Sequence, residues 1–255
     1  MFFLIRKVES LFKLLKSKTK KDQKVEIKRN KITELSISLV SLCNQSIIAE
    51  KYRTIRTNIQ FSAIDKDLNT LVVTSPGPNE GKSITAANLA IAFANTKKQI
   101  LLVDADLRNP TIAMTFHLPT NEGLSNLLSD YETTADEYIL KTNIENLWIL
   151  PSGPKPPNPS EILETKRMEE MIAKLSIDFD LIIFDVPPVA IVTDAQILAS
   201  KTDGTLIIVR ERMTEKKELV KAKELLEIAK ANVLGVIYNG AQKDSELSYY
   251  YQELQ

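Results

Sequence analysis

The sequence predicts one α/β domain with a doubly wound, mostly parallel sheet that carries helices on both faces. Short apolar runs, which we expect to be strands, alternate along the 255 residues with helical patterns. Several of these runs contain Val and Ile at consecutive positions, as is usual for strands that are buried on both faces of a parallel sheet. The expected strands cover 70–74, 100–103, 147–150, 181–184, 205–209 and 233–238, and the expected helices between them cover 83–95, 166–175, 194–200 and 215–229. Ligands of such a fold bind at the carboxyl ends of the strands.

A basic arm, residues 1–33, precedes this domain. Residues 1–31 contain eleven Lys or Arg and three acidic residues, whereas the formal net charge of the whole chain is +0. Apolar residues recur at helical spacing between basic ones over 1–15, which predicts an amphipathic helix followed by a Lys-rich linker. Such a helix can lie on a membrane surface through residues 1–20, pack on a partner helix or fold back on its own domain. The charge favours a phospholipid surface or an acidic protein segment as partner, and we expect no nucleic acid.

The composition predicts a cytoplasmic protein. Its single cysteine, Cys43, excludes an internal disulfide and suits a reducing compartment. No run approaches the ~20 apolar residues of a membrane span, and charged residues interrupt the apolar start, so we do not expect a secretory signal. One His and one Cys do not predict a structural zinc site either. We expect the folded domain to cover 34–242, with a helix over 45–64 that leads into the first strand. A flexible tail should cover 243–255.

The first expected strand leads into a phosphate-binding loop, in the sequence LVVTSPGPNEGKSITAAN. In such a loop the backbone N–H groups wrap the phosphates, the Lys82 ammonium reaches the β- and γ-phosphates, and the Ser83 hydroxyl ligates Mg²⁺. Strict motif spacing would place the first glycine at position 76, where this chain has Pro76 without an N–H to donate. We expect the nucleotide to contact Gly77, Asn79, Glu80, Gly81, Lys82, Ser83 and Ile84.

A second motif, ILLVDADLRNP, ends an expected strand in Asp104 and places Asp106 and Arg108 two and four residues further on. Two carboxylates beside a phosphate loop can hold a metal ion and accept a proton from an incoming hydroxyl. A lone Asp after a strand is often a helix cap, which is the alternative for Asp104. The complete Asp-x-Asp-x-Arg pattern favours the catalytic interpretation.

A third motif, LIIFDVPPV, delivers Asp185 to the end of another strand. A carboxylate at this place typically binds Mg²⁺ through a water ligand. Because the ends of parallel strands meet at one edge of the sheet, we expect Mg²⁺ to be held by Ser83, Asp106 and Asp185.

Together these residues resemble the bacterial tyrosine kinases of capsule and exopolysaccharide synthesis, of the stand-alone cytoplasmic type. The similarity runs from about Glu50 to the C-terminus, and its most particular stretch is LPSGPKPPNPSEIL, in which the proline-rich residues 151–159 follow an expected strand and should rim the nucleotide site. The resemblance implies a P-loop fold related to the partitioning and division-site ATPases, with ATP and Mg²⁺ as cofactors. It gives the phosphate, metal and general-base roles to Lys82, Ser83, Asp104, Asp106 and Asp185.

The resemblance also implies roles for single residues. Asp104 is the expected acceptor of the tyrosine proton, and Asn239, after the last strand, falls where relatives of this fold contact the adenine. Glu50, Arg53 and Arg56 match the family's Glu-x-x-Arg-x-x-Arg motif, which mediates subunit contacts in a ring that we expect to be an octamer. Their spacing of three places them on one helical face, and a solvated face with local ion pairs is the alternative.

A tyrosine cluster in the tail gives the expected phosphate acceptors. Tyr249, Tyr250 and Tyr251 are adjacent in an otherwise polar terminus and have no core to join. The resemblance implies that the chain phosphorylates them itself. It further implies activation by the cytoplasmic end of a membrane-spanning polysaccharide co-polymerase, so we expect the enzyme at the inner face of the cell membrane.

Two other functions remain open from the sequence. The first is a switch ATPase that resembles the chromosome-partitioning and division-site proteins. Those proteins use an extra lysine near the start of the phosphate loop, whereas residues 75–77 are Ser-Pro-Gly here and the tyrosine cluster would be unexplained. The second is a scaffold that has lost efficient transfer, which Pro76 and the short tyrosine cluster would suit.

Overall fold

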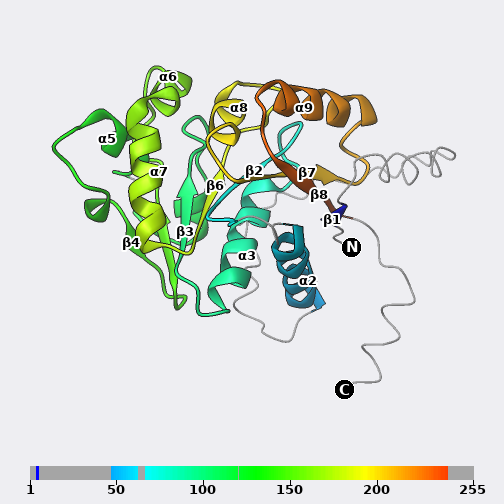
Figure 1. Cartoon of the computed structure of the whole chain (residues 1–255), viewed down its shortest axis with the longest axis horizontal. Coiled ribbons are helices and arrows are strands. Elements are labelled where there is room, and N and C mark those ends of the chain that lie inside the picture. Colours follow the sequence, from blue (N-terminus) through cyan, green and yellow to red (C-terminus); the bar gives the residue numbers. More distant parts are fainter. Residues whose placement is uncertain (1–3, 6–46, 63–66, 120, 241–255) are drawn as a thin grey trace, which may run out of the picture.

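The computed structural model describes residues 4–5, 47–62, 67–119 and 121–240. Within these residues, eight strands form one sheet in the order β1-β8-β7-β2-β6-β3-β5-β4 (Figure 1). Six central strands pair in parallel, and the short β1 and β4 pair antiparallel at the two edges. The strands are β1 (Leu4–Ile5), β2 (Thr70–Thr74), β3 (Ile100–Asp104), β4 (Leu140–Lys141), β5 (Leu147–Leu150), β6 (Leu181–Asp185), β7 (Gly204–Arg210) and β8 (Val233–Asn239). The expected fold class is confirmed.

Helices cover both faces of the sheet (Figure 1). α2 and α3 pack on one face and α7 on the other, and consecutive strand residues alternate between the two cores, as Val72 does with its neighbours Leu71 and Val73. The helices are α2 (Ile47–Ser62), α3 (Lys82–Ala94), α4 (Ile112–Thr115), α5 (Leu124–Ser129), α6 (Pro159–Glu164), α7 (Lys166–Asp178), α8 (Asp194–Ala199) and α9 (Lys216–Ile228), with a 3₁₀ turn, η2 (Ala135–Glu137).

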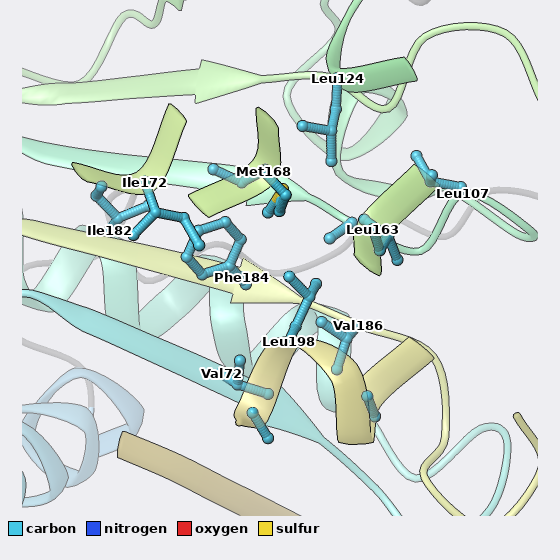
Figure 2. Close-up of a cluster of buried hydrophobic side chains, with 14 of the residues drawn as sticks. Val72, Leu107, Leu124, Leu163, Met168, Ile172, Ile182, Phe184, Val186 and Leu198 are labelled. Atoms are coloured by element: carbon cyan, nitrogen blue, oxygen red, sulfur yellow. The ribbon is translucent and has the colours of Figure 1, made fainter. Parts of the chain in front are cut away.

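The core fixes the strands that lead to the site. Figure 2 shows Met168 and Ile172 of α7 over Ile182 and Phe184 of β6, with Leu198 of α8 beside them, all buried. Burial of each such side chain stabilises the fold by roughly 1.5–3 kcal/mol. Because β6 is packed on both faces, its last residue, Asp185, has a fixed position at the carboxyl end of the strand.

α3 lies between the sheet and α2. Every residue from Thr85 to Ala94 is buried, so the helix has no polar face. Its alanines allow close packing, and its first residues directly follow β2 and the intervening loop. The phosphate-loop helix is therefore a buried, rigid element.

The N-terminal prediction needs a correction. The expected helix over 1–15 is wrong at Leu4–Ile5, which form β1 and pair with Ile237 and Val236 of β8. The edge of a sheet presents unpaired N–H and C=O groups, and an extended segment satisfies them where a helix would not. The rest of the arm and linker, the start of the expected domain at 34–46, and 241–255 lie outside the described residues.

The other predicted elements are confirmed, with small differences at their ends. α7 continues to Asp178, three residues beyond the prediction. The short α4, α5, η2 and β4 were not predicted, because elements of two to six residues show no periodicity. None of the described helices is long and apolar enough to cross a membrane.

Candidate active site

Residues 75–81, between β2 and α3, form the expected loop. Gly81 has a φ of 91°, and a Cβ added there would lie 2.4 Å from the Nδ2 atom of Asn239, so the position requires glycine. Asn79 also has a positive φ, of 60°, which asparagine tolerates better than most residues. The first N–H groups of α3 have no partner within the helix and, together with its dipole, attract an anion at this end.

Two carboxylates contact one ammonium group at the carboxyl ends of the strands, and a third belongs to the same cluster. Asp104 and Asp185 are paired across the neighbouring strands β3 and β6, and Asp106 follows β3. The Nζ atom of Lys82 lies 2.8 Å from Oδ2 of Asp106 and 3.3 Å from Oδ1 of Asp185. It also lies 3.2 Å from the Oγ atom of Ser83. The structure therefore brings together residues that the sequence predicted from three separate motifs.

These buried charges shift one another's pKa values. Burial, followed by the charge of Asp185, raises the pKa of Asp104 to about 7, although the N–H of Ile112 and the charge of Lys82 oppose the shift. Burial also raises the pKa of Asp185, again against Lys82. Burial acts to lower the pKa of Lys82, but Asp185 and Asp106 outweigh it and the net pKa is raised. The cluster thus keeps a charged lysine and a carboxyl group that titrates near neutral pH.

The two oxygens of Asp104 have different surroundings. Oδ2 accepts hydrogen bonds from the backbone N–H groups of Thr111 at 3.0 Å and Ile112 at 2.9 Å, at the start of α4. The helix-cap interpretation is therefore correct for this oxygen. Oδ1 is buried and, among the described residues, has no hydrogen-bond partner. A buried acceptor without a donor is costly, and it is free to accept a hydroxyl proton.

The oxygen groups of the cluster suit Mg²⁺ bound together with a nucleotide. Among the described residues, no three His, Cys, Asp or Glu side chains could hold a metal ion by themselves. Mg²⁺ usually takes one or two carboxylates and completes its shell with waters and substrate phosphates. The Ser83 hydroxyl and the Asp106 carboxylate, which both contact the Lys82 ammonium, supply the protein's share of such a shell.

Comparison with known proteins identifies the family. A family model described as an AAA domain matches residues 78–227, a range that includes the whole carboxylate cluster. Tyrosine-protein kinase YwqD of Bacillus subtilis (strain 168) is 40% identical over 227 residues, which are 88% of this chain and 95% of that protein. The chain belongs to the bacterial tyrosine-protein kinases of capsule biosynthesis. Its enzyme class is therefore that of a protein-tyrosine kinase.

Solved structures agree with this tyrosine-kinase assignment. The crystal structure of the chimerical protein CapA2B2 superimposes with a TM-score of 0.78 at 41% identity and covers 82% of this chain and 92% of that chain. The septum site-determining protein MinD of Pyrococcus horikoshii OT3, complexed with Mg-ADP, matches with a TM-score of 0.57 at 22% identity over 66% of this chain and 69% of that chain. The MinD match shows a shared fold alone, so the relatives favour the kinase over the switch ATPase.

In this kinase, Arg108 joins the loops at the sheet edge, a role that the sequence did not reveal. Its Nε and Nη2 atoms donate to the buried carboxylate of Asp194 on α8 at 2.9 Å and 3.0 Å. Nη2 also donates to the Oγ atom of Ser160 on α6 at 2.9 Å, and Ser160 donates to Asp194 at 2.6 Å. The segment 151–159 leads into α6, so this network ties the proline-rich stretch to the loop that carries Asp106.

The predicted adenine residue lies next to the phosphate loop. The Nδ2 atom of Asn239 donates to the backbone carbonyl oxygen of Glu80 at 3.3 Å. Asn239 is the last residue of β8, one residue inside the strand rather than after it, so the end of β8 contacts the loop directly. The adenine contact stays a prediction.

The predicted subunit-contact residues lie on α2, away from the carboxylate cluster. Glu50 and Arg53 form an ion pair with each other, which is the local pairing that the sequence left open. The Nη1 atom of Arg56 donates to the backbone oxygen of Ala92 on α3 at 2.8 Å, so Arg56 contacts the phosphate-loop helix. The predicted acceptors at 249–251 lie outside the described residues.

Proposed function

We propose that this kinase uses ATP and Mg²⁺ to phosphorylate its own C-terminal tyrosines, at 249–251, and thereby regulates capsular or exopolysaccharide synthesis. One observation carries the proposal: the ammonium of Lys82 contacts the carboxylates of Asp106 and Asp185, and Asp104, paired with Asp185 across the strands, keeps a buried Oδ1 atom without a hydrogen-bond partner among the described residues. Phosphoryl transfer needs a cation for the phosphates, ligands for a metal and a base for the hydroxyl, and this arrangement offers all three.

The proposed roles follow from the chemistry of each group. Gly77 and residues 79–84 contact the nucleotide, and the backbone N–H groups at the start of α3 bind its phosphates. The Lys82 ammonium moves from Asp106 and Asp185 to the phosphate oxygens. Mg²⁺, when bound, neutralises charge that develops on those oxygens during transfer. The tyrosine oxygen attacks the γ-phosphorus, the bond to the ADP oxygen breaks, and Oδ1 of Asp104 takes the tyrosine proton. A pKa of about 7 suits Asp104 to this task at neutral pH.

The proposal extends to partners and location. A membrane-spanning polysaccharide co-polymerase activates the kinase, which works in the cytoplasm at the inner face of the membrane. The subunits form a ring through α2, which we expect to be an octamer. In support, the α2 side chains Ile48 and Phe61 are 45% and 57% exposed, and Glu50 and Arg53 are partly exposed beside them. Phosphate on the tail adds negative charge that separates the subunits.

The test is phosphate mapping on the purified chain. We would incubate it with ATP and Mg²⁺, with and without the cytoplasmic C-terminal peptide of the co-polymerase encoded beside it, and locate phosphotyrosine by mass spectrometry. Lys82→Met is the inactive control. We expect phosphate at 249–251 that is absent from this control. ATP hydrolysis without phosphotyrosine, even with the peptide, would favour the switch ATPase, and neither activity would favour the scaffold.

A further inference from the structure

We propose that Glu80 is a positioning residue for the phosphate loop, which it ties to residues 211–215, the segment between β7 and α9. The inference rests on the proposed function, because it concerns how the loop that binds ATP is held in shape. Glu80 lies inside the loop motif and is only 2% exposed. Burial of a carboxylate is costly unless its oxygens accept hydrogen bonds, so the donors to Glu80 show which segments it holds together.

Both oxygens of Glu80 are engaged by protein groups. Oε2 accepts the backbone N–H of Gly77, at the other end of the loop, at 2.7 Å. Oε1 accepts the hydroxyl of Thr214, which lies beyond β7 and 134 residues away in the sequence. The Thr214 hydroxyl oxygen in turn accepts the backbone N–H of Arg210 at 2.8 Å. One carboxylate therefore closes the loop on itself and anchors it to the neighbouring segment.

Two further contacts attach the same part of the loop to the ends of β7 and β8. The Nη1 atom of Arg210 donates to the backbone oxygen of Asn79 at 3.0 Å, and Asn239 donates to the backbone oxygen of Glu80. The backbone N–H of Glu211 donates to the backbone oxygen of Asn239 at 2.8 Å, so the two donors belong to one hydrogen-bonded unit. Two adjacent loop residues, Asn79 and Glu80, are thus held by the ends of β7 and β8, strands that lie far from the motif in the sequence.

The loop needs such support for two reasons. Asn79 has a positive φ angle of 60°, which a residue other than glycine keeps only where its surroundings hold it there. Pro76 stands at the place of the first motif glycine and has no N–H to donate, so the turn is closed by the side chain of Glu80 through Gly77. Without these anchors, the loop would have to be ordered when ATP binds, and that ordering entropy would weaken binding.

Glu80 is not expected to contact the phosphates itself. Its charge has the same sign as theirs, and both of its oxygens already accept hydrogen bonds. Burial raises its pKa, while the hydroxyl of Thr214 and the N–H of Gly77 oppose the shift, so these two contacts favour the ionised form. The negative charge of Glu80 repels ATP and lowers the affinity, whereas its support of the loop raises the affinity. Two substitutions separate them.

The experiment measures the ATP dissociation constant by isothermal titration calorimetry on the full chain with Mg²⁺. Glu80→Ala removes both anchors, and we expect it to weaken ATP binding about tenfold. Glu80→Gln keeps an acceptor for Gly77 and an N–H for the hydroxyl of Thr214, and should bind ATP at least as tightly as the wild type. Thr214→Val should weaken binding about threefold, whereas Thr214→Ser, which keeps the hydroxyl, should not.

A double-mutant cycle tests whether the two residues act together. Because Thr214 acts through Glu80, Glu80→Ala combined with Thr214→Val should bind ATP no more weakly than Glu80→Ala alone. Urea unfolding of each variant ensures that only folded protein is compared, since a merely structural residue would change stability and leave the affinity of the folded protein unchanged. Unchanged or tighter ATP binding by Glu80→Ala, or strictly additive losses, would overturn the inference. A wild type that binds no ATP would instead refute the proposed function.

Discussion

Replacement of Asp104 by Asn should stabilise the folded kinase above neutral pH. The pKa of Asp104 is about 7 in the folded chain against a usual 3.8, and each pKa unit corresponds to ~1.36 kcal/mol. Ionisation of this carboxyl group therefore costs the folded state on the order of 4 kcal/mol. The Asn amide oxygen can still accept the N–H groups of Thr111 and Ile112, but its NH₂ group replaces an oxygen without a partner and costs about 1–3 kcal/mol if it stays unpaired. The balance is a stabilisation of about 1–3 kcal/mol at pH 8.

The pH dependence separates this cause from a general packing effect. Folded Asp104 keeps its proton up to a pH of about 7, whereas the unfolded chain loses it near 3.8. Between these values the unfolded state binds fewer protons, so the wild type loses stability as pH rises, by up to ~1.36 kcal/mol per unit. This contribution is complete below pH 3.8 and absent above 7. The Asn variant lacks it, so its advantage should grow by about 3 kcal/mol from pH 5 to pH 8.

Urea unfolding at pH 5, 6, 7 and 8 and constant ionic strength measures this difference. The exposed Asp136 provides a matched control, because Asp136→Asn makes the same chemical change outside the cluster and should show no growing advantage. The Asp104→Asn variant should also lose phosphotransfer despite its greater stability, since its amide accepts no proton from tyrosine. An advantage that stays constant from pH 5 to pH 8 would refute the burial of an ionisable Asp104.

Three other predictions concern the loop, the arginine network and the metal. Gly81→Ala should lower the free energy of unfolding by about 1–3 kcal/mol and abolish ATP binding, because the residue has a positive φ and its Cβ would collide with Asn239. Gly77→Ala is the control: its Cβ would have no neighbour closer than 3.9 Å, so it should change the unfolding free energy by less than ~1 kcal/mol. Arg108→Lys should slow transfer about tenfold in a kcat assay, because an ammonium cannot make the paired bonds to Asp194; an unchanged kcat would show that the network does not support the site. Removal of Mg²⁺ with EDTA should abolish tyrosine phosphorylation measured by mass spectrometry, and activity that persists would contradict the proposed metal ligands.

The strands that carry the site could be predicted closely from the sequence. β2 has the expected bounds, and β3 and β6 each extend the expected strand by one residue, to Asp104 and Asp185. Such strands are buried on both faces, so most of their positions are apolar, and in β3 and β6 a carboxylate after the apolar run is the last residue of the strand. The pairing of parallel strand ends then places the carboxylates side by side.

The arm shows where local pattern was not sufficient. The apolar and basic alternation over 1–15 fits a helix, yet Leu4–Ile5 pair with the edge strand β8. Two residues carry too little periodic signal to decide between helix and strand, and the unpaired groups of β8 decided it. No feature of the arm's own sequence predicts that it pairs with the edge of β8.

The contacts that support the site were also beyond sequence analysis. Glu80 and Thr214 are 134 residues apart, and Arg108 and Asp194 are 86 apart. Thr214 and Asp194 stand next to helix starts, where such residues usually serve as caps. A hydrogen bond between distant polar side chains leaves no periodicity in the chain, so the motifs predict candidate site residues but not the contacts that hold them.

The two sequence interpretations of Asp104 concern different oxygens, so the cap contact does not exclude the proposed role of a base. Its Oδ2 atom is a cap for α4, and this pair of N–H bonds fixes the carboxylate plane. Because Oδ2 is fixed in this way, Oδ1 is held in a buried position where no described group donates to it. The contacts that orient the side chain therefore leave one buried oxygen without a donor, and burial raises the pKa of Asp104 to about 7, which suits the proposed role of a base. A stable Asn variant without activity would show that the kinase gives up stability at this position in order to accept a proton.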